Sequence, residues 1–283
     1  MMIVRTIGEL RFALAKQRAN GWTVGFAPTM GALHDGHRSL MEAASWDGCL
    51  GVASIFVNPL QFAAGEDLDS YPRTLDADAA MAEEAGISYV FAPSAVEMYP
   101  EPSWTTVSLD VVTEPWEGES RPTHFAGVAT VMTKLLSIVG PCRAYFGEKD
   151  YQQLAMLRRM AYDLNLDAEI IGMPTIREDD GLAMSSRNRR LTPEHRAEAP
   201  IVSQALRLGI AAIDAGETNP ATVEALIRDA LSTAPSADAP DYVAVVDANS
   251  LRTPDHLTGE VRVLTAVRFG DVRLIDNMGT LIS

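Results

Sequence analysis

The chain has 283 residues, of which 47% are hydrophobic and 22% charged, and its formal net charge at pH 7 is −15. This length exceeds a typical domain of roughly 100–200 residues and is enough to bury a large core without disulfides or metals. The acidic balance excludes non-specific nucleic-acid binding, which needs a basic surface, but it is compatible with a nucleotide substrate.

The amino terminus carries Arg5 and Glu9 and lacks the apolar core and cleavage site of a signal peptide. No stretch approaches about 18 apolar residues, so no membrane span is expected. Cys49 and Cys142 form no CxxC pair, and no His or Cys lies at zinc-finger spacing from either. We therefore expect two structural thiols and a reducing, cytoplasmic location.

The first half of the chain alternates between helical and strand patterns. Helices are predicted over residues 6–20, 36–45, 76–86, 126–139 and 151–164. Strands are predicted over residues 23–28, 49–57, 88–93, 143–147 and 168–173. This alternation is typical of a parallel sheet covered on both faces, in which ligands gather at the carboxyl ends of the strands. We predict an α/β fold with a Rossmann-like doubly wound parallel sheet.

After about residue 185 the pattern changes. Helical stretches over roughly 194–215 and 220–233 precede three segments, YVAVVDA, VRVLTAVRF and DVRLID, that look like antiparallel strands. Residues 232–240 read as a linker-like loop. We predict two domains, a Rossmann-like catalytic domain over 1–185 and a smaller C-terminal α+β domain over 186–283.

The strongest local motif is PTMGALHDGH, residues 28–37, between a predicted strand and a predicted helix. Gly31 and Gly36 let the backbone approach a ligand closely, and the helix N-terminus offers unpaired N–H groups. His34 and His37 lie three residues apart on one side of the turn, where they can donate to phosphate oxygens. The alternatives are a metal pair, which HxxH without a nearby third ligand makes weaker, or two surface histidines.

Two further motifs carry phosphate-binding groups. GEKDYQQL, residues 147–154, also follows a predicted strand; Lys149 suits phosphate, Asp150 a helix cap or a ribose hydroxyl, and Gln153 lies one turn into the helix. GLAMSSRNRRL, residues 181–191, can surround a triphosphate with hydroxyl, backbone and guanidinium donors. The alternative interpretation of the first motif is a solvated lysine at the start of a helix, and that of the second is a polar interdomain loop.

HxGH after the first strand and a downstream MSSR loop look like the HIGH and KMSKS pair of the nucleotidyltransferase superfamily. Within it, the chain closely resembles the pantothenate synthetase (pantoate–β-alanine ligase) family. The matching segments run from about residue 30 to 277 in the family's order: PTMGALHDGH, SIFVNPLQF, YPRTLDAD, FAPSAVEMYP, RPTHFAGV, FGEKDYQQL, DGLAMSSRN and RLIDN.

The resemblance implies a reaction in two steps. The carboxylate of (R)-pantoate attacks the α-phosphorus of Mg-ATP to give pantoyl adenylate and pyrophosphate, and β-alanine then displaces AMP to form pantothenate. ATP as substrate, Mg²⁺, pantoate and β-alanine are the implied ligands, with no nucleic-acid or membrane partner. The resemblance also implies a homodimer, and the position of the MSSR loop suggests that the C-terminal domain acts as a lid.

The resemblance also assigns site residues. The implied ATP-binding residues are Met30, Gly31, Ala32, Leu33, His34, Asp35, Gly36, His37, Gly147, Glu148, Lys149, Asp150, Ile176, Met184, Ser185, Ser186 and Arg187. The implied catalytic residues are His37, as proton donor, with His34, Lys149 and Arg187. The implied pantoate residues are Gln61, Gln153 and Asn58, with Arg121 and His124 nearby, and Asp78 is an expected indirect Mg²⁺ ligand.

One position departs from the family pattern. The family usually has glycine where this chain has Thr123, and a positive φ there would strain a β-branched residue.

Three other functions are alternatives. A cytidylyl- or adenylyltransferase of the same superfamily would retain the nucleotide in its product. A tRNA-charging enzyme would need a basic appendage that this acidic chain lacks. A nucleotide-binding regulatory module would bind ATP without releasing pyrophosphate.

Overall fold

The computed structural model describes residues 1–46, 48–63, 68–101 and 103–282, and their contacts divide them into two compact units. The first unit comprises Met1–Thr113, Arg121–Gly147 and Gln153–Pro174, and the second comprises Glu114–Ser120, Glu148–Gln152 and Thr175–Ser283. Two short segments, and also residues 175–184, thus precede residue 185 and group with the C-terminal residues. The functional division predicted at residue 185 stays a prediction.

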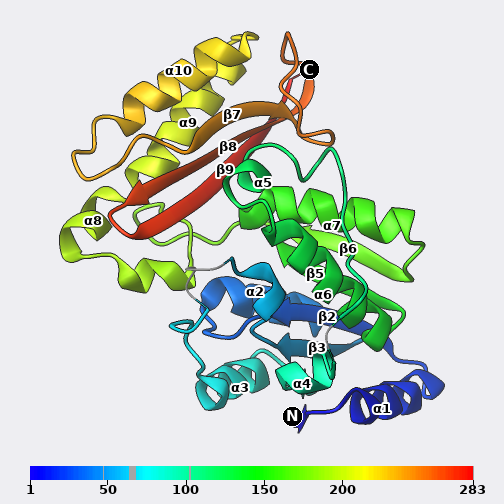
Figure 1. Ribbon diagram of the computed structural model, residues 1–283. Helices are drawn as coiled ribbons and strands as arrows, with labels where there is room; N and C mark the ends of the chain where they lie inside the picture. The colour runs from blue at the N-terminus through cyan, green and yellow to red at the C-terminus, as the bar shows by residue number, and fades with distance from the viewer. Residues whose placement is uncertain (47, 64–67, 102, 283) are drawn as a thin grey trace. The chain divides into compact units, whose positions relative to one another are not determined.

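A parallel sheet forms the centre of the first unit. Its six strands are β1 (Met2–Val4), β2 (Thr23–Thr29), β3 (Cys49–Ile55), β4 (Tyr89–Phe91), β5 (Cys142–Gly147) and β6 (Ala168–Met173). They pair in the order β1-β4-β3-β2-β5-β6, and every pairing is parallel (Figure 1). The chain order therefore reverses between β2 and β5, which is the switch point at which ligands bind in open α/β sheets.

The helices of this unit are α1 (Ile7–Ala19), α2 (Asp35–Ala44), α3 (Leu75–Glu84), α4 (Ala95–Met98), α6 (His124–Val139) and, from Gln153 on, α7 (Tyr151–Asp163), with the short 3-10 helix η1 (Pro59–Gln61). Helix α2 packs on β2, β3 and β5 with α3 beside it, and α1 packs against α6. Strand β2 is buried on both faces, because Ala27 joins the core under α2 while its neighbour Phe26, also fully buried, points the other way. The predicted doubly wound α/β fold is confirmed.

The second unit contains an antiparallel sheet with strands in the order β7 (Tyr242–Asp247), β8 (Gly259–Phe269) and β9 (Val272–Ile282). Its helices are α5 (Glu117–Ser120), α8 (Pro193–Glu198), α9 (Ile201–Asp214) and α10 (Pro220–Leu231), with the 3-10 helices η2 (Glu148–Asp150) and η3 (Ser186–Arg190). Helices α9 and α10 pack on each other and on this sheet (Figure 1). The predicted C-terminal α+β character is confirmed.

The helix predicted over 194–215 was wrong as a single element. The structure has α8 and α9 there, because Pro200 lacks the N–H of a continuous helix and becomes the N-cap of α9. Strand β9 also extends six residues past the predicted end at Asp276, pairing with β8 as far as Gly259–Ile282. No helix in the described part of the chain is both long and apolar enough to cross a membrane.

Candidate active site

The turn after β2 has a backbone that few sequences can adopt. Gly31 and Ala32 both have positive φ, +83° and +51°, and the buried carboxylate of Asp78 holds them in place. One oxygen of Asp78 accepts from Ala32 N at 3.1 Å and from the Thr74 hydroxyl at 3.1 Å, and the other accepts from Leu33 N at 2.9 Å. Asp78 is 3% exposed, so three hydrogen bonds offset the desolvation of its charge.

The two histidines lie at the start of α2. His34 is the N-cap, its Nδ1 accepts from Gly36 N at 3.2 Å, and its own backbone N–H points at His37 Nδ1 at 3.4 Å. The two ring centroids are 4.0 Å apart. This imidazole capping box fixes both rings at a helix N-terminus, where N–H groups and dipole favour an anion.

The predicted pantoate residues Asn58 and Gln61 belong to one buried network in the first unit. Asn58 Nδ2 donates to Gln61 Oε1 at 3.1 Å and to the Gly127 carbonyl at 3.1 Å, and its Oδ1 accepts from the Tyr99 hydroxyl at 2.9 Å. Burial raises the pKa of Tyr99 to about 12, so this hydroxyl keeps its proton and donates. Gln61 Oε1 is thereby held by Asn58, and the Gln61 amide nitrogen donates to the Met30 sulfur at 3.0 Å, which leaves its second N–H available to a ligand.

Arg121 and His124 lie against the backbone of the same segment. His124 Nδ1 is 3.0 Å from the Gln61 carbonyl oxygen, and Arg121 donates to that oxygen at 3.4 Å. Thr123 between them has φ −98° and ψ −9° as the N-cap of α6. The backbone of Thr123 is in the right-handed helical region, so the strain that a positive φ would cause at this position is absent.

Gln153 lies in the first turns of α7, where it is partly buried. Helix α7 follows β5, which ends at Gly147, the strand on the other side of the switch point from β2. Residues 30–37 and Gly147, all in the first unit, therefore lie at the carboxyl ends of the two neighbouring strands between which the sheet order reverses. This is the arrangement in which an open α/β sheet takes a ligand.

In the second unit, the η2 turn carries Glu148, Lys149 and Asp150. The Lys149 ammonium lies 3.9 Å from the Asp150 carboxylate, and its side chain is 19% exposed. The next residues anchor the turn: the Tyr151 hydroxyl donates to the Ala248 carbonyl at 3.1 Å.

The MSSR loop begins with a small hairpin. Met184 N donates to the Ile176 carbonyl at 3.0 Å. Ile176 is the residue predicted to contact adenine, and Met184 begins the loop predicted to bind the triphosphate, so this hydrogen bond joins the two segments. Ser185 caps η3 by accepting from Arg187 N at 3.3 Å. The buried amide of Asn188 closes the loop by donating to the Ala183 carbonyl at 3.0 Å.

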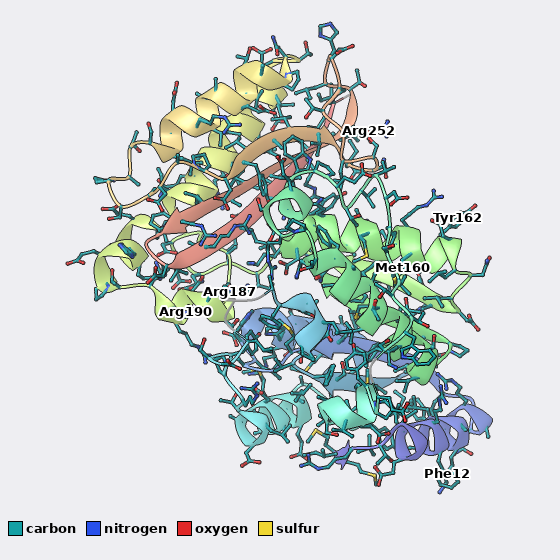
Figure 2. The ribbon with its side chains drawn as sticks, viewed as in Figure 1. Phe12, Met160, Tyr162, Arg187, Arg190 and Arg252 are labelled. Carbon is teal, nitrogen blue, oxygen red and sulfur yellow. The ribbon has the colours of Figure 1, made fainter. Side chains whose placement is uncertain are left out.

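Ser186 opens η3, and Arg187 and Arg190 project from it in Figure 2. In the described residues, no three His, Cys, Asp or Glu side chains group as a metal site.

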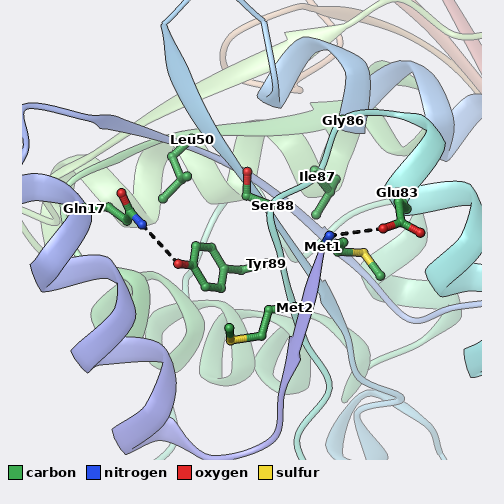
Figure 3. Close-up of a pocket in the computed structure, with 9 residues that line it drawn as sticks. All are labelled: Met1, Met2, Gln17, Leu50, Glu83, Gly86, Ile87, Ser88 and Tyr89. Atoms are coloured by element: carbon green, nitrogen blue, oxygen red, sulfur yellow. Dashed lines mark hydrogen bonds and ion pairs between the residues drawn. The ribbon is translucent and has the colours of Figure 1, made fainter.

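A shallow pocket lies at the amino ends of the strands of the first unit's sheet, away from the predicted nucleotide-binding turn (Figure 3). It lies where β1, β3 and β4 begin, beside Met2, Leu50 and Tyr89. The Tyr89 hydroxyl accepts from Gln17 at 3.2 Å and the terminal ammonium of Met1 pairs with Glu83 at 3.1 Å. Because ligands bind at the carboxyl ends of parallel strands, this amino-end pocket does not compete for the nucleotide.

Comparison with known proteins decides the family. The family model described as pantoate-beta-alanine ligase matches residues 2–279. The chain belongs to this family. It is 51% identical to the pantothenate synthetase of Rhizorhabdus wittichii over 278 residues, 98% of each chain. It is 47% identical to that of Acetivibrio thermocellus, over 98% of this chain and 99% of the relative.

Solved structures of pantoate-β-alanine ligases agree with the fold described above. Pantothenate synthetase from Thermus thermophilus has a TM-score of 0.93 at 46% identity, covering 98% of this chain and 99% of that one. The ligase from Francisella tularensis, complexed with beta-gamma ATP and β-alanine, has a TM-score of 0.79 at 32% identity, covering 98% and 97%. The chain is therefore a ligase that joins pantoate and β-alanine at the expense of ATP.

Two residues that hold predicted site residues in place were not predicted from the sequence. Tyr99 fixes Asn58 and thereby Gln61, and Asn277 donates to the Lys149 carbonyl. Both stand in segments that carried the resemblance, FAPSAVEMYP and RLIDN, so the signal was a conspicuous motif to which no chemistry had been assigned.

Proposed function

We propose that this pantoate-β-alanine ligase works through a pantoyl adenylate and that the site residues assigned by resemblance carry the reaction. The observation that supports this most is the placement of PTMGALHDGH and GEKD directly after β2 and β5, the strands that flank the switch point. Each motif brings phosphate-binding groups, two imidazoles and an ammonium, to the end of its strand.

Within the first unit, the turn over residues 30–37 is the proposed ATP-phosphate segment. His34 and His37 donate hydrogen bonds to phosphate oxygens, and His37 is the proton donor. Asp78 acts on the nucleotide indirectly, because its carboxylate sets the backbone of Ala32 and Leu33. Preorganised donors of this kind need no reorganisation as negative charge develops, and removing one typically costs about 10²–10³ in rate.

The proposed pantoate residues are Gln61 and Gln153, with Arg121 and His124 supporting the Gln61 backbone. The hydrogen-bonding groups of Asn58 are already engaged with Tyr99, Gln61 and Gly127, so its proposed task is to orient Gln61. An amide N–H aimed by a neighbour discriminates strongly, since a ligand lacking its oxygen would leave that donor unpaired.

Within the second unit, Lys149 and Arg187 are proposed to bind phosphates, with Glu148, Asp150, Met184, Ser185 and Ser186 around the nucleotide. Ile176 is proposed to meet adenine through its backbone. Lysine suits a phosphate as a point charge, and arginine as a planar pair of donors.

The chemistry follows from the leaving groups. A pantoate carboxylate oxygen forms a bond to the α-phosphorus, the bond between the α-phosphorus and its bridging oxygen breaks, and pyrophosphate leaves. The β-alanine nitrogen then bonds to the acyl carbon, the carbon–oxygen bond breaks, AMP leaves with the former carboxylate oxygen, and the nitrogen loses a proton. Bound donors offset the repulsion between the carboxylate and the triphosphate.

Mg²⁺ is proposed to arrive on the phosphates of ATP, whose charge it would partly neutralise. Such an ion keeps several waters and needs only one or two protein carboxylates. The predicted indirect ligand, Asp78, already accepts three hydrogen bonds, and its proposed contact with the ion runs through a water molecule.

We also propose a cytoplasmic homodimer. Two free cysteines, Cys49 and Cys142, support a reducing compartment, and the dimer rests on the family resemblance. The lid role of the C-terminal residues, and the absence of nucleic-acid and membrane partners, are further proposals. Sedimentation at micromolar concentration tests the dimer.

The experiment that tests the function measures pyrophosphate released from Mg-ATP. We expect release that requires pantoate and does not require β-alanine, with AMP and pantothenate appearing once β-alanine is added. ATP binding without pyrophosphate release would instead indicate a regulatory module. Release with a different acceptor only would indicate another nucleotidyltransferase.

A further inference from the structure

The RLIDN segment, residues 273–277 of β9, buries three polar side chains that the reaction as proposed does not use. Asp276 is 4% exposed and Asn277 3% exposed, and the Arg273 side chain is 13% exposed. Burying such groups costs free energy unless each is hydrogen-bonded. Their partners therefore show what the strand holds in place, and all of these partners lie within the second unit.

Asn277 holds the lysine turn by its backbone. Its Nδ2 donates to the Glu148 carbonyl and to the Lys149 carbonyl, each at 2.8 Å. Its Oδ1 accepts from Arg262 Nη1 at 3.1 Å. A guanidinium can only donate and a carbonyl can only accept, so these partners set the orientation of the amide without ambiguity.

Arg262 supports the same turn by contacting the side chains of Glu148 and Tyr151. Its guanidinium lies over the Tyr151 ring, 3.8 Å from the ring centroid, and Nη1 is 3.5 Å from the Glu148 carboxylate. Main-chain and side-chain contacts thus converge on residues 148–151 from one face of the sheet formed by β8 and β9.

The neighbouring residue, Asp276, holds the other nucleotide segment. Its two carboxylate oxygens accept from the two terminal nitrogens of Arg177 at 2.6 Å and 2.9 Å. Arg177 also donates to the Gly181 carbonyl at 3.1 Å and pairs with Ala183 as a β-bridge. The carboxylate is therefore bonded to the hairpin from which the MSSR loop leaves.

We propose that Asn277 and Asp276 are positioning residues that fix the Lys149 turn and the MSSR hairpin to one strand at a constant spacing. Adjacent residues of a strand point to opposite faces, so one dipeptide reaches both segments. Lysine is a flexible point charge, and its aim depends on where its backbone is held. A misplacement of about 1 Å at a reacting centre costs about 10²-fold in rate. This inference rests on the proposed roles of Lys149 and Arg187.

Asn277→Asp isolates the positioning role. The substitution preserves size and keeps an oxygen toward Arg262, but it turns two donated hydrogen bonds into two close oxygen–oxygen contacts with the Glu148 and Lys149 carbonyls. We expect kcat for pantoate-dependent pyrophosphate release to fall about 10–100-fold, with KM for pantoate within about twofold of the unmodified enzyme. Asn219→Asp, an exposed N-cap that accepts either residue, makes the same charge change and should leave kcat and stability unchanged.

A double-mutant cycle with Lys149→Ala separates positioning from stability. If Asn277 acts through Lys149, the 10–100-fold effect should shrink to less than about threefold in the Lys149→Ala background. The same loss in both backgrounds, or a lowered melting temperature with unchanged kinetic constants, would overturn the proposal. Absence of pantoate-dependent pyrophosphate release from the unmodified enzyme would instead refute the proposed function itself.

Discussion

Asp78→Asn tests whether this carboxylate builds the phosphate turn or serves the metal ion. The carboxylate accepts from Ala32 N, Leu33 N and the Thr74 hydroxyl. The asparagine amide has one oxygen, and in either orientation its NH₂ group faces one of the two backbone N–H groups. The variant therefore loses one charge-assisted hydrogen bond and leaves a buried donor unpaired, a cost of about 2–3 kcal/mol.

Two measurements on the Asp78→Asn enzyme distinguish the roles. Urea unfolding without nucleotide should show this loss of about 2–3 kcal/mol, and the loss should be the same with and without Mg²⁺. KM for ATP should rise, because the turn at Gly31 and Ala32 relaxes, while the Mg²⁺ concentration for half-maximal rate at saturating ATP stays constant. Asp76→Asn, an exposed carboxylate on the same helix, is the matched control.

The reasoning would be refuted by unchanged stability together with a higher Mg²⁺ requirement. That pattern would mean that Asp78 serves the ion and that its backbone hydrogen bonds contribute little to the turn.

Three further predictions concern the first unit. Tyr99→Phe removes the hydroxyl that donates to Asn58, so KM for pantoate should rise several-fold with a stability loss of about 1 kcal/mol, measured by steady-state kinetics and urea unfolding. Gly127→Ala would place a Cβ 2.2 Å from a carbonyl oxygen of η1, so we expect a loss of about 1–3 kcal/mol in urea unfolding and weaker pantoate binding. Burial raises the pKa of Cys142 to about 12, so iodoacetamide at pH 8 should alkylate the partly exposed Cys49 first and reach Cys142 only on unfolding.

Each of these has its own check. Gly8→Ala, in α1 with open space around it, should be neutral or stabilising, which separates crowding at Gly127 from a general effect of the substitution. An unchanged KM for pantoate in Tyr99→Phe would mean that the Tyr99 hydroxyl does not help to orient Gln61. Equal alkylation rates of the two native cysteines would contradict the burial of Cys142.

The Cys142 thiol ionises at about pH 8.5 in the unfolded chain but stays protonated in the folded protein. The free energy of unfolding should therefore fall as pH rises above that value.

Local chemistry explains why much of the fold could be predicted from the sequence. The segment 168–173 is short and apolar apart from Glu169, and it forms β6 with the predicted bounds. Asn20 and Gly21 end α1 as expected, with Gly21 at φ +88°. Strand β1 was missed because three residues are too few for a periodic pattern, and it is recognisable only through its pairing with β4.

The end of β9 was missed for a different reason. Asn277 is a poor strand residue by intrinsic preference, so the sequence pattern predicts a strand that stops at Asp276. The structure keeps Asn277 in the strand because its amide binds the Glu148 and Lys149 carbonyls, some 128 residues earlier in the chain. A partner this distant leaves no local signal, and tertiary contact overrides propensity.

The candidate site divides in the same way. His34 and His37 were predicted to share one side of a turn, and their rings are 4.0 Å apart, because a spacing of three at a helix start decides the geometry. The hydrogen bonds of Asp78 to Ala32 and Leu33 span 46 and 45 residues, respectively, and could not be predicted. Sequence therefore predicted the geometry of residues close together in the chain, but not the distant side chains that hold them.

The most direct test of the adenylate route traces the carboxylate oxygens of pantoate into the products. Pantoate labelled with ¹⁸O in its carboxylate would be converted with ATP and β-alanine, and AMP, pyrophosphate and pantothenate would be analysed by mass spectrometry. The account predicts one labelled oxygen in AMP and none in pyrophosphate, because the carboxylate oxygen that attacks the α-phosphorus leaves with it. Either of two results would contradict the adenylate: label-free AMP with labelled pyrophosphate, which indicates attack at the β-phosphorus, or ADP with labelled inorganic phosphate, which indicates an acyl phosphate.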